Sequence, residues 1–154
     1  MKNRIRVIGT VQDGAIEDEV IKRLQLVIGE TYCRYFGGNH HLTFIWLTIP
    51  RGQAFLAAKP STTSVLQLPV QDLLADHIRH DFMSEVSAQW QKNTGCSKNE
   101  IILSCPDASY AKHYFDKVNE RFNASTKVFI QIKLLLRLMI GKLKKGYLNT
   151  SINF

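Results

Sequence analysis

The sequence has few cysteines, and their arrangement argues against a disulfide-stabilised secreted domain. Its 154 residues include three cysteines, Cys33, Cys96 and Cys105, which are dispersed and form no CxxC pair. Small secreted domains usually carry an even, closely spaced set of cysteines. We therefore expect reduced thiols and a cytoplasmic location.

The sequence also lacks a long uninterrupted apolar run. The most apolar stretch, residues 128–143, is broken by Lys133, Arg137 and Lys142, whereas a helix that spans a bilayer needs about 20 predominantly apolar residues. The apolar stretch near the amino terminus is broken by Arg6 and is too short for a secretory signal. These features predict a soluble protein.

Acidic residues are scarce at the carboxyl-terminal end. Residues 1–110 carry 11 Lys or Arg and 11 Asp or Glu, whereas residues 111–154 carry 9 and 2, so the net charge of +7 lies in the last 44 residues. A basic protein often binds nucleic acid, but a neutral body with a basic end weakens that interpretation. We expect no nucleic-acid partner.

Two halves of the remaining sequence repeat the same order of elements. Residues 4–11 favour a strand, an amphipathic pattern from Ala15 predicts a helix that ends at Gly37, and residues 42–49 form an apolar strand before Pro50. The periodicity is that of a β-α-β unit.

The second half follows at a nearly constant distance. Residues 64–70 favour a strand, residues 74–90 a helix that ends at Gly95, and residues 100–105 a third β-prone run. The two glycines that end the helices, Gly37 and Gly95, are 58 residues apart. This spacing predicts a duplicated β-α-β unit.

Such a duplication implies an α/β (α+β) fold with a four-stranded sheet and two helices on one face. The other face is then uncovered, and apolar side chains such as Phe44, Trp46 and Leu66 are expected to point to it. A symmetric oligomer would supply the missing layer. The alternative is that the basic segment folds back over this face.

Three strings resemble the tautomerase superfamily, which includes 4-oxalocrotonate tautomerase, macrophage migration inhibitory factor (MIF) and cis-3-chloroacrylic acid dehalogenase. They are RIRVIGTVQDGAIEDEVIKRL, TYCRYFGGNHHLTFIWLTIPRGQAFLAAKPS and TGCSKNEIILSCPDASY. The resemblance implies a tautomerase-like domain over residues 1–110, usually assembled as a homotrimer. Residues 111–154 would be a basic amphipathic C-terminal extension.

The resemblance implies keto-enol tautomerase (isomerase) activity on a small carbonyl or 2-oxo acid, without a cofactor. Family enzymes use an amino-terminal proline as general base, but this chain has no proline before Pro50. Its own amino group, close to Lys2, Arg4 and Arg6, is another candidate base. The alternative is a non-catalytic relative that uses the fold for binding or assembly.

Five residues are candidates for substrate binding, and they are Arg4, Tyr32, Asn39, Lys59 and Ser104. Arg4 lies in a cationic strand start that would hold a carboxylate, unless it is the solvent side of an ordinary strand. The other four take their role from the resemblance. Tyr32 falls where dehalogenase-like members place a histidine, Asn39 near a pocket lysine and Ser104 near a pocket tyrosine or asparagine. Lys59 falls in a loop at the pocket mouth, or is an ordinary surface lysine.

The histidines offer no metal site. His40 and His41 are adjacent on a strand start and point to opposite faces, and the i, i+3 pair His77 and His80 lacks a third ligand. Cys105 at a strand end is better explained as a structural thiol than as a nucleophile, because no motif places a base beside it.

The basic segment has two possible partners. Residues 127–148 combine apolar residues with six Lys or Arg and no acid, a composition typical of a helix that lies on a membrane surface. The alternative is contact with a neighbouring subunit, since residues 128–132 also suit a strand.

Overall fold

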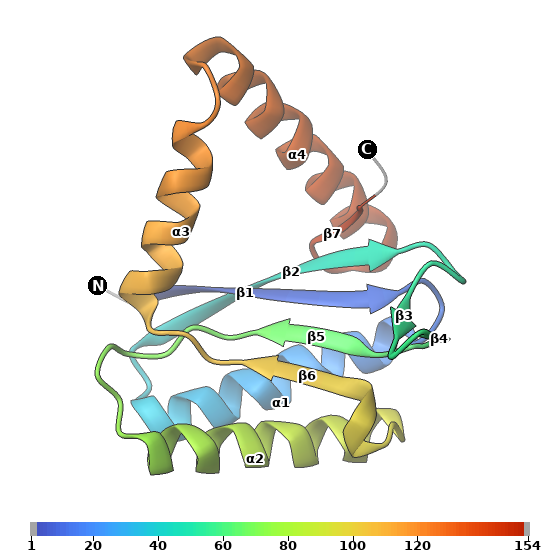
Figure 1. Cartoon of the computed structure of the whole chain (residues 1–154), viewed down its shortest axis with the longest axis vertical. Helices are drawn as coiled ribbons and strands as arrows, with labels where there is room; N and C mark the ends of the chain where they lie inside the picture. Colours follow the sequence, from blue (N-terminus) through green and yellow to red (C-terminus); the bar gives the residue numbers. More distant parts are fainter. Residues whose placement is uncertain (1–2, 153–154) are drawn as a thin grey trace.

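The structure, a computed structural model, describes residues 3–152. In chain order the elements are β1 (Asn3–Gln12), α1 (Asp18–Phe36), β2 (His40–Ile49), β3 (Phe55–Leu56), β4 (Lys59–Pro60), β5 (Ser64–Gln67), α2 (Asp76–Thr94), the 3-10 turn η1 (Lys98–Glu100), β6 (Ile101–Ser104), α3 (Ala108–Glu120), α4 (Ala124–Lys145) and β7 (Asn149–Ser151). Figure 1 shows a sheet with α1 and α2 on one side, and α3 and α4 extending from the other side.

The sheet has the order β6-β5-β1-β2-β7. The strands of each predicted unit, β1 with β2 and β5 with β6, are parallel, and the two units meet through the antiparallel pair β1 and β5. The α+β class and the repeated β-α-β order therefore appear as expected. The predicted number of four strands is wrong, because β7 pairs with β2 as a fifth strand.

Alternation along β1 and β2 determines which side chains enter the core. Val7 and Val11 face α1 and α2 and are buried, and Trp46 of β2 is fully buried on the same side. Gly9 is required beneath this ring, because a Cβ at that position would lie 2.5 Å from Trp46 Cε3.

The expectation that Phe44, Trp46 and Leu66 point to the uncovered face is wrong. All three are buried in the core, and the Trp46 ring centroid lies 6.2 Å from that of Trp90 in α2. Because β2 is apolar at nearly every position, its sequence does not show which alternate set faces the helices. The partly exposed Ile45 lies on the opposite, open face, beside Ile8.

The two long helices end where the sequence predicts. Gly37 and Gly95 follow α1 and α2, both with positive φ, and the Gly95 N–H donates to the Gln91 carbonyl oxygen at 2.8 Å. Between the helices, Tyr32 packs edge-on against Phe82, with ring centroids 5.7 Å apart. These contacts hold both helices on one face of the sheet.

Helices α3 and α4 form an arm that leaves the sheet and returns to it (Figure 1). The predicted boundary at residue 110 lies in the first turn of α3, and the possible strand at residues 128–132 is instead part of α4. The returning end of α4 packs on β7 through the buried Leu138 and through Gly141, where a Cβ would lie 2.1 Å from the Asn149 carbonyl oxygen. No helix within residues 3–152 is long and apolar enough to cross a membrane.

Candidate functional site

A cavity of about 650 Å³ lies between the amino-terminal end of β1 and helix α3. Its walls come from β1, β2, the segment after β5, and one side of α3. The lining residues are Arg4, Ile5, Arg6, Thr43, Pro69, Ala108, Ala111, Lys112, Phe115, Asp116 and Asn119. The cavity lies at the start of the first strand, where Arg4 was expected to hold a carboxylate, and it is formed within one chain.

The cavity is lined by three cations and one acid. Arg4 and Arg6 extend from alternate positions of β1 on the open face, and Lys112 and Asp116 lie one turn apart on α3. The Arg6 guanidinium carbon lies 5.6 Å from the centroid of the Phe115 ring, a cation–π contact that joins the strand to the helix. The net positive charge suits a small carboxylate ligand.

The amino-terminal end of α3 is fixed over the sheet by backbone and side-chain contacts. The Ala108 N–H donates to the Val70 carbonyl oxygen at 2.8 Å, and Arg79 forms an ion pair with Asp107 at 2.6 Å. The Ser109 N–H donates to Asp72 Oδ1 at 2.9 Å, which lowers the pKa of that carboxyl. Because these contacts hold α3 over the sheet, the cavity is bounded by β1 on one side and by α3 on the other.

Tyr32 supports the cavity from behind. Its side chain is buried, and its hydroxyl donates to the carbonyl oxygen of Pro69, a lining residue, at 3.1 Å. Burial raises the pKa of Tyr32 to about 12, so the phenol is neutral at physiological pH. The structure therefore gives Tyr32 a contact with the wall, and it is not among the cavity-lining residues.

Asn39 and Ser104 lie at the same end of the sheet as Arg4 but outside the cavity lining. Asn39 is exposed in the turn before β2, and its carbonyl oxygen accepts the Asn3 N–H at 2.9 Å. Ser104 is exposed at the end of β6, opposite Gln67 of β5. Neither side chain is brought into contact with Arg4.

Lys59 is exposed in β4, a short strand that pairs only with β3, at the other end of β1. This position is fixed by Gln12, whose side-chain amide donates to the Ser61 carbonyl oxygen at 3.3 Å. Since β1 is ten residues long, Lys59 and Arg4 of one chain are separated by roughly 30 Å. Lys59 of the same chain therefore does not belong to this cavity.

The contribution of α3 to the cavity was not predicted from the sequence. Lys112, Asp116 and Asn119 line the cavity, but they follow the end of the resemblance and were assigned to the basic extension. Their i, i+4, i+7 spacing places them on one side of a helix, which is the signal that would have grouped them. Thr43 of β2 also lines the cavity, without a comparable signal.

Cys105 is not among the residues that line this cavity. Burial raises the pKa of the Cys105 thiol to about 12, although the nearby Arg79 lowers it, so the thiol remains protonated. Within residues 3–152 no three His, Cys, Asp or Glu side chains form a group that suits a metal ion. The terminal amine and Lys2, proposed above as part of a base, lie outside the described residues.

No family model and no curated protein matches the sequence. Solved structures do match. Ps01740 has 17% identity and a TM-score of 0.62, over 68% of this chain and 96% of that chain. N1, a member of the cis-3-chloroacrylic acid dehalogenase family, has 8% identity and a TM-score of 0.61, over 66% and 73%. MIF2 of Leishmania major has 9% identity and a TM-score of 0.56, over 70% and 91%.

Fused 4-OT proteins solved as symmetric and asymmetric trimers also match, with TM-scores of 0.58 or 0.59. The chain therefore has the fold of the tautomerase superfamily, and it shares this fold with MIF-like and dehalogenase-like proteins. The predicted resemblance is confirmed at the level of the fold.

Proposed function

We propose that the chain is a tautomerase-superfamily protein that binds a small carbonyl or 2-oxo acid in the cavity between β1 and α3. The supporting observation is the charge of the cavity lining. It contains three cations, Arg4, Arg6 and Lys112, and one acid, Asp116. A substrate carboxylate would pair with Arg4 and Arg6. Keto–enol tautomerisation is the proposed reaction.

The proposed reaction needs a base that accepts a proton from the carbon beside the carbonyl group. Asp116 is the carboxylate of the cavity lining, and Lys112 one turn before it is placed to stabilise the negative charge that forms on the enolate oxygen. These roles replace the amino-terminal proline used elsewhere in the superfamily. The proposed assembly is a cytoplasmic homotrimer.

The test is turnover of phenylpyruvate and 2-hydroxymuconate by untagged protein, with a parallel measurement of ligand binding. Arg4→Ala is expected to raise KM by about tenfold, the value of one charge-assisted contact. Arg23→Ala, which removes an exposed arginine of α1, is the matched control and should leave KM unchanged. Asp116→Asn is expected to lower kcat by about a hundredfold or more while ligand still binds.

Two outcomes separate the proposal from its alternative. Turnover that depends on Arg4 and Asp116 supports the tautomerase. Saturable binding that weakens in Arg4→Ala, without turnover above buffer, would instead identify a non-catalytic relative that keeps the cavity for binding.

A further inference from the structure

Helix α4 presents one apolar side that is largely exposed in the described chain. Its inner side packs on β7 through Leu138 and Gly141. With 100° between successive residues, the opposite side forms a continuous arc of about 140°. We call this arc the outer stripe, and its members are Val128, Phe129, Ile132, Leu135, Leu136, Met139, Ile140 and Leu143.

The outer stripe is too exposed to belong to the core of this chain. Its eight side chains have exposed fractions between 48% for Met139 and 84% for Leu143. Scattered apolar residues are normal on a protein surface, but a contiguous patch along about four turns of one helix marks an interaction site. An apolar surface of this extent suits a partner outside the described chain.

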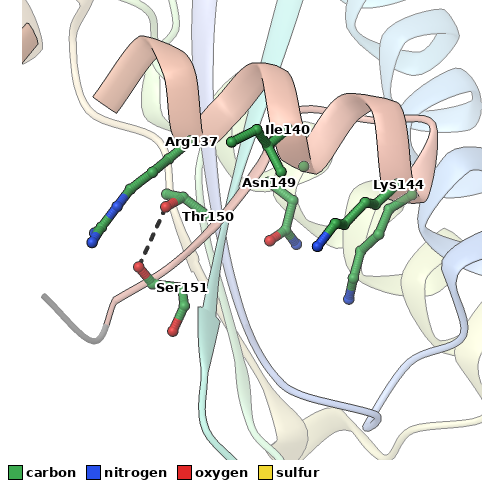
Figure 2. A pocket seen from close by; sticks show the side chains of 8 residues that line it. Arg137, Ile140, Lys144, Asn149, Thr150 and Ser151 are labelled. Carbon is green, nitrogen blue, oxygen red and sulfur yellow. Dashed lines mark hydrogen bonds between the residues drawn. The ribbon is translucent and has the colours of Figure 1, made fainter. Parts of the chain in front are cut away.

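Positive charges border the outer stripe on both sides. Lys133, Arg137 and Lys144 follow one border, and Lys142 lies on the other. Figure 2 shows Arg137 and Lys144 extending from one side of α4 beside Ile140. Residues 121–152 contain seven Lys or Arg and no Asp or Glu. The partner must accept an apolar stripe and positive charges together.

Two surfaces of a second copy, its own α4 and the open face of its sheet, do not offer matching charges. Pairing of one α4 with another would bring the same lysines together. The open face of the sheet carries Arg4 and Arg6, and none of the seven strands contains an acidic residue. Like charges across an interface oppose association, so these surfaces are poor partners for α4.

We propose that α4 binds the surface of an anionic lipid bilayer. The helix lies in the plane of the membrane, with the outer stripe among the upper parts of the acyl chains and the bordering lysines at the phosphate groups. Long basic side chains can extend from an apolar face to the headgroups in this way. Anionic lipids supply negative charge for the basic residues that border the outer stripe, whereas Asp13 and Asp18 of the chain pair with Lys145 on the inner side of α4. This binding is independent of the proposed chemistry in the cavity.

Co-sedimentation of the full chain with lipid vesicles tests the proposal. We expect the protein to pellet with phosphatidylcholine vesicles that contain about a third phosphatidylglycerol, and to stay in solution with phosphatidylcholine alone. Added salt should weaken the binding, because it screens the charges. Protein that remains in solution with both vesicle types overturns the proposal.

The outer stripe is tested with a double substitution, Phe129→Gln with Leu136→Gln. Both side chains are well exposed, at 67% and 59%, so the fold should be kept, which the thermal unfolding midpoint checks. The vesicle partition coefficient should fall on the order of tenfold or more. The control is Leu26→Gln with Leu73→Gln, which removes two exposed leucines outside α4. This variant should leave the vesicle partition coefficient unchanged.

The basic borders are tested with Lys133→Gln and Lys142→Gln. Each lysine near an anionic surface contributes about fivefold to binding, so the double variant should lose roughly twenty-five-fold. Lys92→Gln with Lys98→Gln, two exposed lysines of the neutral body, is the matched control.

The oligomeric state distinguishes the lipid proposal from the alternative, in which the outer stripe contacts a second copy of the chain. If vesicle binding is unaffected by the stripe variant while its mass in sedimentation equilibrium falls below that of the wild type, the stripe joins subunits and the lipid proposal is wrong. If vesicle binding is lost and the mass is unchanged, α4 is the lipid-binding helix.

Discussion

Cys105 illustrates how burial determines the chemistry of one side chain. It lies directly after β6 in the core, where burial raises the pKa of its thiol to about 12. A group with that pKa has almost no thiolate at pH 8, and the thiolate is the reactive form. Iodoacetamide should therefore leave Cys105 unmodified in the folded protein, as read by peptide mass spectrometry.

The other two cysteines serve as internal references. Cys33 and Cys96 are partly exposed and should be alkylated in the native protein, and all three should react in urea. Rapid labelling of Cys105 under native conditions would contradict its buried position.

For individual residues, the sequence predicted part of the candidate site. Arg4 was recognised because charge and strand position are local properties, and the structure places it in the cavity lining. Lys112 and Asp116 were missed because their role depends on how Arg79 and Asp107 fix the amino-terminal end of α3 to the sheet. The spacing of these residues groups them on one side of a helix, but the long-range contact that directs this side to the cavity is not visible in the residues of α3.

Two helical glycines predict opposite effects of the same substitution. Replacing Gly29 in α1 by alanine meets no atom within 4 Å and should stabilise the protein by about 1 kcal/mol through helix propensity. At Gly141 the added Cβ would lie 2.1 Å from the Asn149 carbonyl oxygen, so α4 must move away from β7. We expect Gly141→Ala to destabilise by about 1–3 kcal/mol.

Urea unfolding of the two variants measures both effects, with Gly29→Ala as the matched control for Gly141→Ala. Equal stabilisation by both substitutions would show that α4 does not dock closely on β7.

Elements with a strong local pattern were predicted well. The periodicity of α1 and the glycine at its end, and the alternation of β1, depend on neighbouring residues only. The three-residue strand β7 has the polar sequence Asn-Thr-Ser and exists because it pairs with Trp46–Thr48, about a hundred residues earlier. Such a strand has no periodicity of its own, so the four-strand prediction failed there.

For the whole molecule, the open face of the sheet predicts assembly. Val65 and Ile102, neighbours on this face, have exposed fractions of 36% and 46%, and Ile8 and Ile45 are only partly covered. An apolar sheet face of this kind is normally covered by another layer. Three copies is the number that we propose above for this assembly.

Sedimentation equilibrium should give a mass of about 53 kDa, three times the chain mass of 17.6 kDa. Ile102→Glu, which places a charge on the open face, should lower this mass toward 17.6 kDa. Leu26→Glu, on the exposed side of α1, is the control and should leave the mass unchanged. A wild-type monomer would refute the trimer.

Strand β7 also covers the edge of β2, which would otherwise be open to pairing with other chains. Without it, the ten-residue strand β2 would present a long, mostly apolar row of unpaired backbone groups, a template on which other chains aggregate. The Trp46 N–H instead donates to the Leu148 carbonyl oxygen at 2.9 Å, and the Thr48 carbonyl oxygen accepts the Ile152 N–H at 3.1 Å. The new edge is short and polar, and α4 lies beside it. Residues after α4 thus protect the folded chain from uncontrolled strand addition.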